Sequence, residues 1–475
     1  MGVFDKFKSQ NIVMKASIVY VAAGFLQRGI TLISGPIFTR LLSQEDYGVL
    51  MLFNTWYELI GIVAMLSLSA GVYNNGLLKY QEDRDVFTAS LLALSNAATI
   101  FVAGVFFLFY DSLAWMIGLS ENLLQLMFLC FFFSPALIFW TTRQRFEYQY
   151  KNSCAVTLSS TSIAVLISVF VTLYSDEAQR LLAKIWSEKM VLFLFWIVLY
   201  VYIFCKAKFK VRMNYWRYAL RVNLPLIPHY LANFMLMGMD RIMISLFVGT
   251  GAAAIYSVAY SAAFLTQIFW QSVNAAILPL TYECIRNKTE GEVNDKVLPF
   301  LALYGAACIF ISFLAPEIMA VLAPPSYQEG VYLIPILMVG VFLTGLYCLF
   351  ANVEFYYEST MMIAVNSCFA AALNFGFNYL LLERYGYTVA AYTTTLCFFI
   401  QTLFHYMNYR RLGSSLYNMK AVVCIFLSVV FGCMFCLWVY DFLMIRYLIL
   451  LLFIGGGWVK RDVLRQLYWG LKNKS

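Results

Sequence analysis

The sequence predicts an all-α, polytopic membrane protein with about fourteen transmembrane helices. Of its 475 residues, 62% are hydrophobic and only 12% are charged, whereas a soluble domain carries about 25% charged residues. The hydrophobic residues lie in blocks of about twenty, the length that an α-helix needs to cross a bilayer. The blocks do not alternate apolar and polar residues, as the strands of a membrane barrel would. These observations exclude a water-soluble globule, a disordered chain, a secreted disulfide scaffold and a nucleic-acid-binding protein.

Fourteen apolar blocks follow one another with short connections. They leave almost no extramembrane domain, and the longest connection runs from about Lys206 to Arg221. The blocks cover residues 16–40, 47–73, 87–110, 122–142, 153–175, 183–205, 220–247, 253–282, 297–323, 330–357, 359–382, 386–408, 418–440 and 443–460.

The positions of Lys and Arg predict the orientation. If the N-terminus lies inside, 25 of the 33 basic residues fall in inside segments and five in outside segments. Loops on the cytoplasmic side of membrane proteins carry such an excess of basic residues. We therefore expect an even number of helices, with both termini in the cytoplasm.

The second half of the chain repeats the topology of the first. The segment 42–50 contains the end of the first helix and the beginning of the second. The segment 248–256 does the same for the seventh and eighth helices. Six helices per repeat give two lobes of the same orientation, a known transporter plan. We expect an N-lobe at 1–205, a basic cytoplasmic linker at 206–219, a C-lobe at 220–411, and two extra helices with a cytoplasmic tail at 412–475.

Arg28 lies about halfway along the first block and needs water, an anion or a partner. A central arginine costs at least ~2.5–3.5 kcal/mol on insertion scales. Because guanidinium matches phosphate oxygens in a fork geometry, Arg28 predicts a cationic cleft that receives phosphate. The alternative is a structural ion pair with Glu58, which lies near the middle of the second block. Glu58 is equally a candidate for cation or proton coupling.

The sixth block contains Lys184, Glu188 and Lys189. Lys184 and Glu188 are four residues apart, a spacing at which helical side chains meet, and we expect them to pair. Lys189 is deeper in the span and faces another direction. We take Lys189 as a candidate cleft residue.

The seventh block should be kinked, because Pro225 and Pro228 interrupt the helical hydrogen bonds. His229 and Asn233 share a face beyond the prolines and are candidates to line the cleft. Asp240 and Arg241 are neighbours that point apart and need different partners. They are candidates for cation coupling or an ion pair, with helix capping and lobe closure as alternatives.

The eighth block has a polar stripe on one helical face. Amides and phenols suit a hydroxyl-rich ligand such as a sugar, although they also form hydrogen bonds between membrane helices. The stripe consists of Tyr256, Tyr260, Gln267, Gln271 and Asn274. In the tenth block, Glu354 is a further candidate for coupling or an ion pair, with helix packing as the alternative.

No hydrolytic or group-transfer motif is visible. The two histidines, His229 and His405, lie in different helices, and no zincin, nucleophile-elbow or P-loop pattern occurs. We therefore assign no catalytic residue, no metal site and no cofactor. Transport would draw on an ion gradient, the membrane potential or the substrate's own gradient.

Several segments together resemble the bacterial polysaccharide flippases. These are the O-antigen and exopolysaccharide translocases of the superfamily that also holds multidrug exporters and the lipid II flippase. Each motif is loose, but their order and topology are fairly specific over nearly the whole chain. The segments are Leu41–Gly48, Asn223–His229, Asp240–Ile244, Ala254–Tyr260, Asn374–Asn378 and Tyr385–Gly386.

The resemblance implies a function in the bacterial inner membrane. Such proteins move undecaprenyl-diphosphate-linked oligosaccharide from the cytoplasmic to the outer leaflet by alternating access, and the coupling would be to cation entry. It also implies a polysaccharide polymerase and a chain-length regulator as partners, and we expect a monomer. A multidrug or small-cation exporter shares the architecture and stays open as the alternative. A membrane-embedded glycan polymerase is disfavoured, because every predicted external loop is short.

Overall fold

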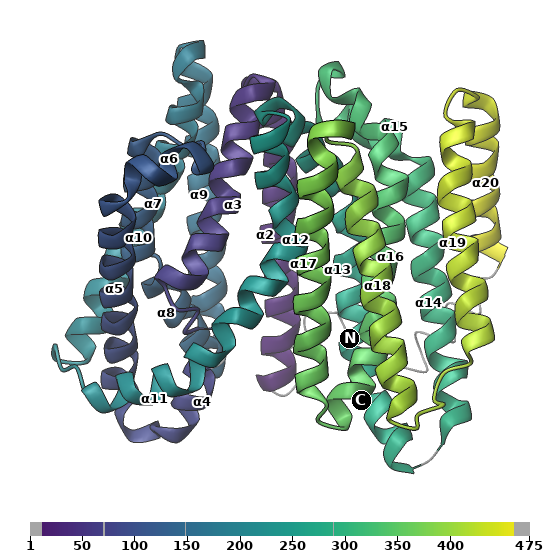
Figure 1. Ribbon diagram of the computed structural model, residues 1–475. Helices are drawn as coiled ribbons and strands as arrows, with labels where there is room; N and C mark the ends of the chain where they lie inside the picture. The colour runs from purple at the N-terminus through teal and green to yellow at the C-terminus, as the bar shows by residue number, and fades with distance from the viewer. Residues whose placement is uncertain (1–11, 70–71, 148, 288, 460–475) are drawn as a thin grey trace, which may run out of the picture. The chain divides into compact units, whose positions relative to one another are not determined.

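A computed structural model describes residues 12–69, 72–147, 149–287 and 289–459 of the chain. Within these residues the protein is helical and contains no strand. The chain divides into two compact units, Met1–Phe234 and Met235–Ser475. Each unit is a helical bundle (Figure 1).

The first unit contains the helices of the predicted N-lobe and the helix in the linker that follows it. The helices are α2 (Ile12–Leu41), α3 (Gln44–Ala64), α4 (Val72–Lys79), α5 (Arg84–Leu108), α6 (Tyr110–Ile117), α7 (Glu121–Phe133), α8 (Pro135–Phe146), α9 (Tyr150–Tyr174), α10 (Arg180–Lys206) and α11 (Met213–Asn223). Two 3-10 turns precede α5 and α10, at Gln81–Asp83 and Glu177–Gln179. Helix α9 packs against α2 and α10, and α5 packs against α3, α7 and α11.

The second unit begins within α12 (Ile227–Phe247), which follows a 3-10 turn at Leu224–Leu226. Its other elements are α13 (Thr250–Asn287), α14 (Glu290–Phe313), α15 (Ala315–Leu322), the 3-10 helix η4 (Pro325–Leu333), α16 (Ile334–Tyr356), α17 (Thr360–Tyr385), α18 (Val389–Arg411), α19 (Met419–Val439) and α20 (Leu443–Val459). Helix α16 packs against α13, α14, α18 and α19. It is buried along almost its whole length, as expected of a helix that is apolar on all sides.

The predicted spans agree with the observed helices. Ten segments of the described chain are long and apolar enough to cross a membrane. The other four predicted blocks coincide with α2, α12, α18 and α20. Helix α18 falls below the hydropathy of the ten because it carries buried polar residues, among them Gln401, His405 and Asn408. Polar residues buried within a membrane helix usually have a structural or functional role.

The predicted second block ran through a break in the helix. Helix α3 ends at Ala64, and Leu66 and Ser67 have φ values of 55° and 44°. Residues other than glycine and asparagine rarely adopt this left-handed conformation. The amide of Asn223 donates a hydrogen bond to the carbonyl of Leu66 and holds the turn. The seventh block is interrupted as predicted, with Pro225 in the 3-10 turn before α12.

The predicted linker is partly a helix, and it packs on the first unit. Two hydrogen bonds tie it to Ser90 of α5: the Arg212 amide donates to the hydroxyl (3.0 Å) and the Trp216 indole to the carbonyl (2.7 Å). The Tyr215 hydroxyl donates to Asp83 (2.5 Å), and burial and this bond raise the pKa of Tyr215. The segment 206–219 therefore belongs structurally with the N-lobe helices.

Candidate functional site

Two lysines and one glutamate form an ion cluster on α10. The Lys189 ammonium lies 3.1 Å from Glu188, and Lys184 pairs with the same carboxylate, as its spacing predicted. The side chains of Lys184, Glu188 and Lys189 are only 10%, 21% and 12% exposed. Because one carboxylate serves two ammonium groups, the cluster keeps an excess of one positive charge within a membrane helix.

Aromatic rings surround the two ammonium groups. Lys184 lies 4.9 Å from the ring centre of Phe38 on α2, and Lys189 lies 5.3 Å from that of Tyr57 on α3. A cation over an aromatic face is attracted by the ring, more strongly where water is excluded. The rings therefore stabilise the charges of the cluster without neutralising them.

A cavity of about 390 Å³ opens in the first unit beside Tyr57. The Tyr57 hydroxyl lies 3.2 Å from Ser134, and its ring connects the cavity to Lys189. The lining is mainly apolar, with Glu58 and several serines as its polar members. It consists of Tyr57, Glu58, Gly61, Ile62, Met65, Ser67, Leu68, Ser69, Ser95, Pro135, Ile138, Phe139 and Phe234. Such a cavity suits an amphipathic ligand near a positive charge.

Arg28 and Glu58 are both exposed. Among the described residues Arg28 forms no ion pair, so the alternative pairing with Glu58 is not seen there. Helix α2 is held against α9 by a hydrogen bond from Gln27 to Thr161 (3.3 Å). Arg28 therefore lies one residue beyond an anchored position on the exposed side of its helix.

His229 and Asn233 meet on α12, as their spacing predicted. Asn233 Nδ2 and His229 Nε2 are 3.1 Å apart. The imidazole Nδ1 is buried and has no partner among the described atoms. Phe234, the next residue of the helix, lines the cavity of the first unit. This part of α12 thus places a polar pair close to the cavity wall.

The second unit contains a buried carboxylate, Asp240. It is 2% exposed and accepts three hydrogen bonds: from Tyr256 (2.7 Å), Thr394 (2.6 Å) and Asn378 (2.6 Å). Asn374 donates to Thr394 (2.9 Å) and extends the network. Helices α12, α13, α17 and α18 therefore meet at one acidic side chain with oxygen and amide neighbours.

The residues of the predicted polar stripe have different surroundings. Arg241 lies 4.8 Å from the ring centre of Tyr260. Gln267 is buried and donates to Thr344 (3.4 Å), and Asn352 donates to Asn274 (2.8 Å). These two amides thus connect α13 to α16.

Gln271, by contrast, is exposed. Gln267, Gln271 and Asn274 are the stripe residues that we expect to bind the substrate, and Gln271 is the exposed one among them.

Glu354 forms a buried hydrogen-bonded contact with His405 that joins α16 to α18. His405 Nδ1 lies 2.7 Å from one carboxylate oxygen, and both side chains are fully buried. Asn408 donates to the other oxygen (2.9 Å). The imidazole stacks on Tyr347 with 5.2 Å between ring centres. The carboxylate of Glu354 therefore links α16 and α18 through His405 and Asn408.

Sequence reasoning missed the neutral partners of these charged groups. Tyr57, Ser134 and Thr394 were not candidates, because a single phenol or hydroxyl in an apolar block gives no distinctive pattern. The only available signals were that Tyr57 precedes Glu58 and that three threonines, 393–395, interrupt an apolar block. In the described part of the chain, no group of three or more His, Cys, Asp or Glu could hold a metal ion.

Comparisons with known proteins agree with this architecture. The protein-family model described as polysaccharide biosynthesis protein matches residues 13–284. A protein of the Lsg locus of Haemophilus influenzae is 22% identical over 365 residues, which are 74% of this chain and 87% of that protein.

Solved structures of transporters share the fold. The lipid II flippase MurJ in an inward closed conformation matches with a TM-score of 0.69 and 15% identity, over 94% of this chain and all of that one. An inward-facing multidrug resistance transporter of the MATE family matches with a TM-score of 0.63 and 15% identity, over 84% of this chain and 99% of that one. This chain therefore has the fold of the MOP-superfamily transporters and belongs to the polysaccharide biosynthesis protein family.

Proposed function

We propose that this protein moves an undecaprenyl-diphosphate-linked oligosaccharide across the bacterial cytoplasmic membrane by alternating access. The observation that carries the proposal is the cluster of Lys184, Glu188 and Lys189, which keeps a net positive charge. Its Lys189 ammonium lies 5.3 Å from the ring centre of Tyr57, and Tyr57 lines the cavity of about 390 Å³. A lipid diphosphate is a dianion, and crossing the bilayer exposes it to a medium that solvates charge poorly. An ammonium group held near the cavity offsets part of that cost.

The remaining candidate residues fit the other parts of such a substrate. Arg28 would contact the diphosphate, and His229 and Asn233 would contact sugar hydroxyls with Gln267, Gln271 and Asn274. The prenyl chain would stay in lipid. We infer that the protein acts as a monomer, with both termini in the cytoplasm, and works with a polymerase and a chain-length regulator.

Asp240 is our candidate for cation coupling. A buried carboxylate with hydroxyl and amide oxygens around it can exchange a proton or a small hard cation. Binding of a proton or cation to Asp240 would change the hydrogen bonds among the four helices that meet there. Glu354 and Arg241 are less favoured, because Glu354 contacts His405 and Arg241 lies over the ring of Tyr260. Glu58 is less favoured because it is exposed, whereas Asp240 is enclosed by hydroxyl and amide groups.

The test is flipping of a fluorescent lipid-linked oligosaccharide by the purified protein in liposomes. We expect Lys189→Gln to slow flipping at least tenfold, because a hydrogen-bonded charge contributes about 1.5–3 kcal/mol. Lys151→Gln is the matched control, since it removes an exposed lysine of the same unit and should leave the rate unchanged. Flipping by the Lys189 variant at the wild-type rate would refute the role of the cluster.

The alternative function, export of organic cations, is favoured by one observation. Glu58 is the acidic member of a cavity with a largely apolar lining, and an acidic group among apolar ones suits a lipophilic cation. Drug susceptibility of cells that express the protein distinguishes the two. A rise in resistance that Glu58→Gln removes would support export, and unchanged susceptibility would support flipping.

A further inference from the structure

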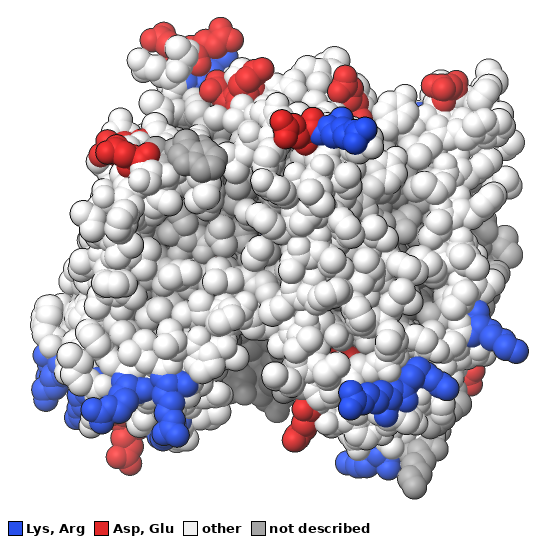
Figure 2. All heavy atoms as spheres, viewed as in Figure 1, with Lys and Arg blue, Asp and Glu red and all other residues white. Residues whose placement is uncertain are grey.

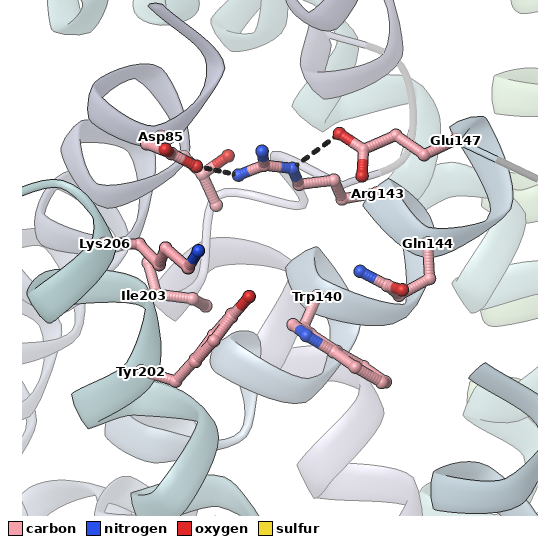
Figure 3. A pocket seen from close by; sticks show the side chains of 9 residues that line it. Asp85, Trp140, Arg143, Gln144, Glu147, Tyr202, Ile203 and Lys206 are labelled. Atoms are coloured by element: carbon pink, nitrogen blue, oxygen red, sulfur yellow. Dashed lines mark hydrogen bonds and ion pairs between the residues drawn. The ribbon is translucent and has the colours of Figure 1, made fainter. Parts of the chain in front are cut away.

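A small second cavity lies in the first unit between α5, α8 and α10, and the residues used below do not line the first cavity. Its volume is about 40 Å³, which admits a phosphate-sized group but no sugar chain. Lys206 is the last residue of α10, so the cavity lies at the end of that helix (Figure 3). In the unit taken alone, this is the end at which the visible Lys and Arg gather (Figure 2). The lining residues used below are Asp85, Trp140, Arg143, Gln144, Glu147, Tyr202 and Lys206.

The charges on one wall of the cavity compensate each other. Arg143 lies 2.5 Å from Asp85 and 2.9 Å from Glu147, and Arg84 lies 3.8 Å from Glu147. Both carboxylates therefore have a guanidinium partner, and Arg143 has little capacity left for a ligand. Figure 3 shows this ion network on one side of the space.

The opposite wall carries side-chain donors that lack a hydrogen-bond acceptor. The side chains of Lys206, Tyr202, Gln144 and Trp140 have no hydrogen bond or ion pair among the residues that the structure describes. The Lys206 ammonium lies 5.8 Å from the ring centre of Tyr202. The Lys206 ammonium, the Tyr202 hydroxyl and the Gln144 amide are turned towards the space between them (Figure 3). Ammonium and indole N–H groups can only donate. A set of this kind is suited to an anion with several oxygen atoms.

The surroundings select a lipid as the source of that anion. Tyr202 is 45% exposed, the preceding residue Val201 is 52% exposed, and Val198, one turn earlier on α10, is 67% exposed. Exposed apolar side chains below a Lys, Trp and Tyr set are the pattern of a membrane surface, where basic pockets between helices bind phospholipid head groups. We propose that this cavity binds the phosphate of an anionic phospholipid, with its acyl chains along α10. The proposal does not depend on what the protein transports.

Native mass spectrometry of the full-length protein tests the site. The protein is titrated with phosphatidylglycerol and, separately, with zwitterionic phosphatidylethanolamine. We expect one phosphatidylglycerol to bind with an affinity that Lys206→Gln lowers about tenfold, the value of one charge-assisted hydrogen bond. Lys208→Gln removes an equally exposed lysine two residues away and should retain the lipid. Equal losses in both variants, or equal binding of the two lipids, would overturn the proposal.

A second variant and a third ligand complete the test. Trp140→Phe keeps an aromatic side chain, although a smaller one, and removes the N–H, so we expect a weaker but measurable loss of phosphatidylglycerol binding. A synthetic polyprenyl diphosphate is then added in competition. If it leaves the phosphatidylglycerol in place at equal concentration, the site belongs to a membrane phospholipid. If it displaces the phosphatidylglycerol in the wild type but not in Lys206→Gln, the cavity is a substrate-docking position and the proposal is wrong.

Discussion

Arg28 is a cation within a membrane helix for which the described part of the structure shows no counter-charge. Such a residue has a high free energy in a bilayer unless an anion or water contacts it. We predict that Arg28→Ala abolishes surface polysaccharide, measured by gel staining of cell extracts, while immunoblots show unchanged protein. Arg28→Lys keeps the charge without the fork geometry and should retain partial activity. Normal polysaccharide in the alanine variant would exclude a contact with phosphate.

A variant of Asp240 can show whether flipping depends on an ion gradient. Asn has the same shape as Asp, so Asp240→Asn can keep the hydrogen bonds from Tyr256 and Thr394 while losing the negative charge. We predict that flipping in liposomes then no longer accelerates when a Na⁺ or proton gradient is imposed. Thr393→Val is the control, since Thr393 bonds Asn378 and not Asp240. A gradient response in Asp240→Asn equal to that of the wild type would contradict coupling at this site.

The sequence shows which charged residues interrupt the apolar blocks, but it does not show which side chains contact them. Every candidate charge, from Arg28 to Glu354, stands out because it interrupts an apolar block. The partners of Asp240 come from three other helices, and Thr394 is separated from it by 154 residues. Only the helix-spaced pairs, Lys184 with Glu188 and His229 with Asn233, could be read directly. Contacts between distant helices depend on packing, which no local spacing encodes.

At the scale of elements, length and hydropathy predict the long apolar helices, whereas they do not predict the short helix α11. The spans agree because a bilayer fixes the length of an apolar helix. The predicted linker at 206–219 contains the first part of α11, and the predicted seventh block contains residues 220–223 of the same helix. Helix α11 is stable because its apolar face packs on α5, with Tyr215 and Ala219 buried, and tertiary packing of this kind is the main support of short helices.

Helix α16 depends on a close approach at Gly345. A Cβ there would lie 2.5 Å from the ring of Tyr304 and 3.1 Å from Trp270. Tyr304 cannot move easily, because it is buried and its hydroxyl donates to Val341 (2.8 Å). We predict that Gly345→Ala destabilises the protein by about 1–3 kcal/mol, the usual cost of overpacking, seen as a lower thermal unfolding midpoint in detergent.

Gly376 in α17 is the control for this packing argument. A Cβ at Gly376 meets nothing within 4 Å, and alanine favours a helix over glycine by roughly 0.5–1 kcal/mol. Gly376→Ala should therefore unfold at the same temperature as the wild type or slightly higher. If the two variants shift the midpoint equally, crowding against Tyr304 is not the cause.

At the scale of the whole molecule, the basic residues of the sequence predict that both six-helix halves enter the membrane in the same direction, as a parallel repeat requires. In the first unit taken by itself, most of the visible Lys and Arg lie at one end (Figure 2). Charge along the chain predicts only this direction, because it carries no information on how helices from distant parts of the sequence pack.

The predicted parallel repeat can be tested in both units at once. The three exposed native cysteines, Cys205, Cys368 and Cys424, are first replaced by serine. Single cysteines are then introduced at exposed positions and treated in intact cells with a membrane-impermeant thiol reagent. The variants are Lys210→Cys and Lys420→Cys at the basic ends, and Glu177→Cys and Glu383→Cys at the opposite ends. Because basic segments stay in the cytoplasm, we expect labelling of the two glutamate positions in intact cells, and of the two lysine positions only after permeabilisation. If the pattern held in one unit and reversed in the other, the units would be antiparallel and the parallel repeat would be wrong.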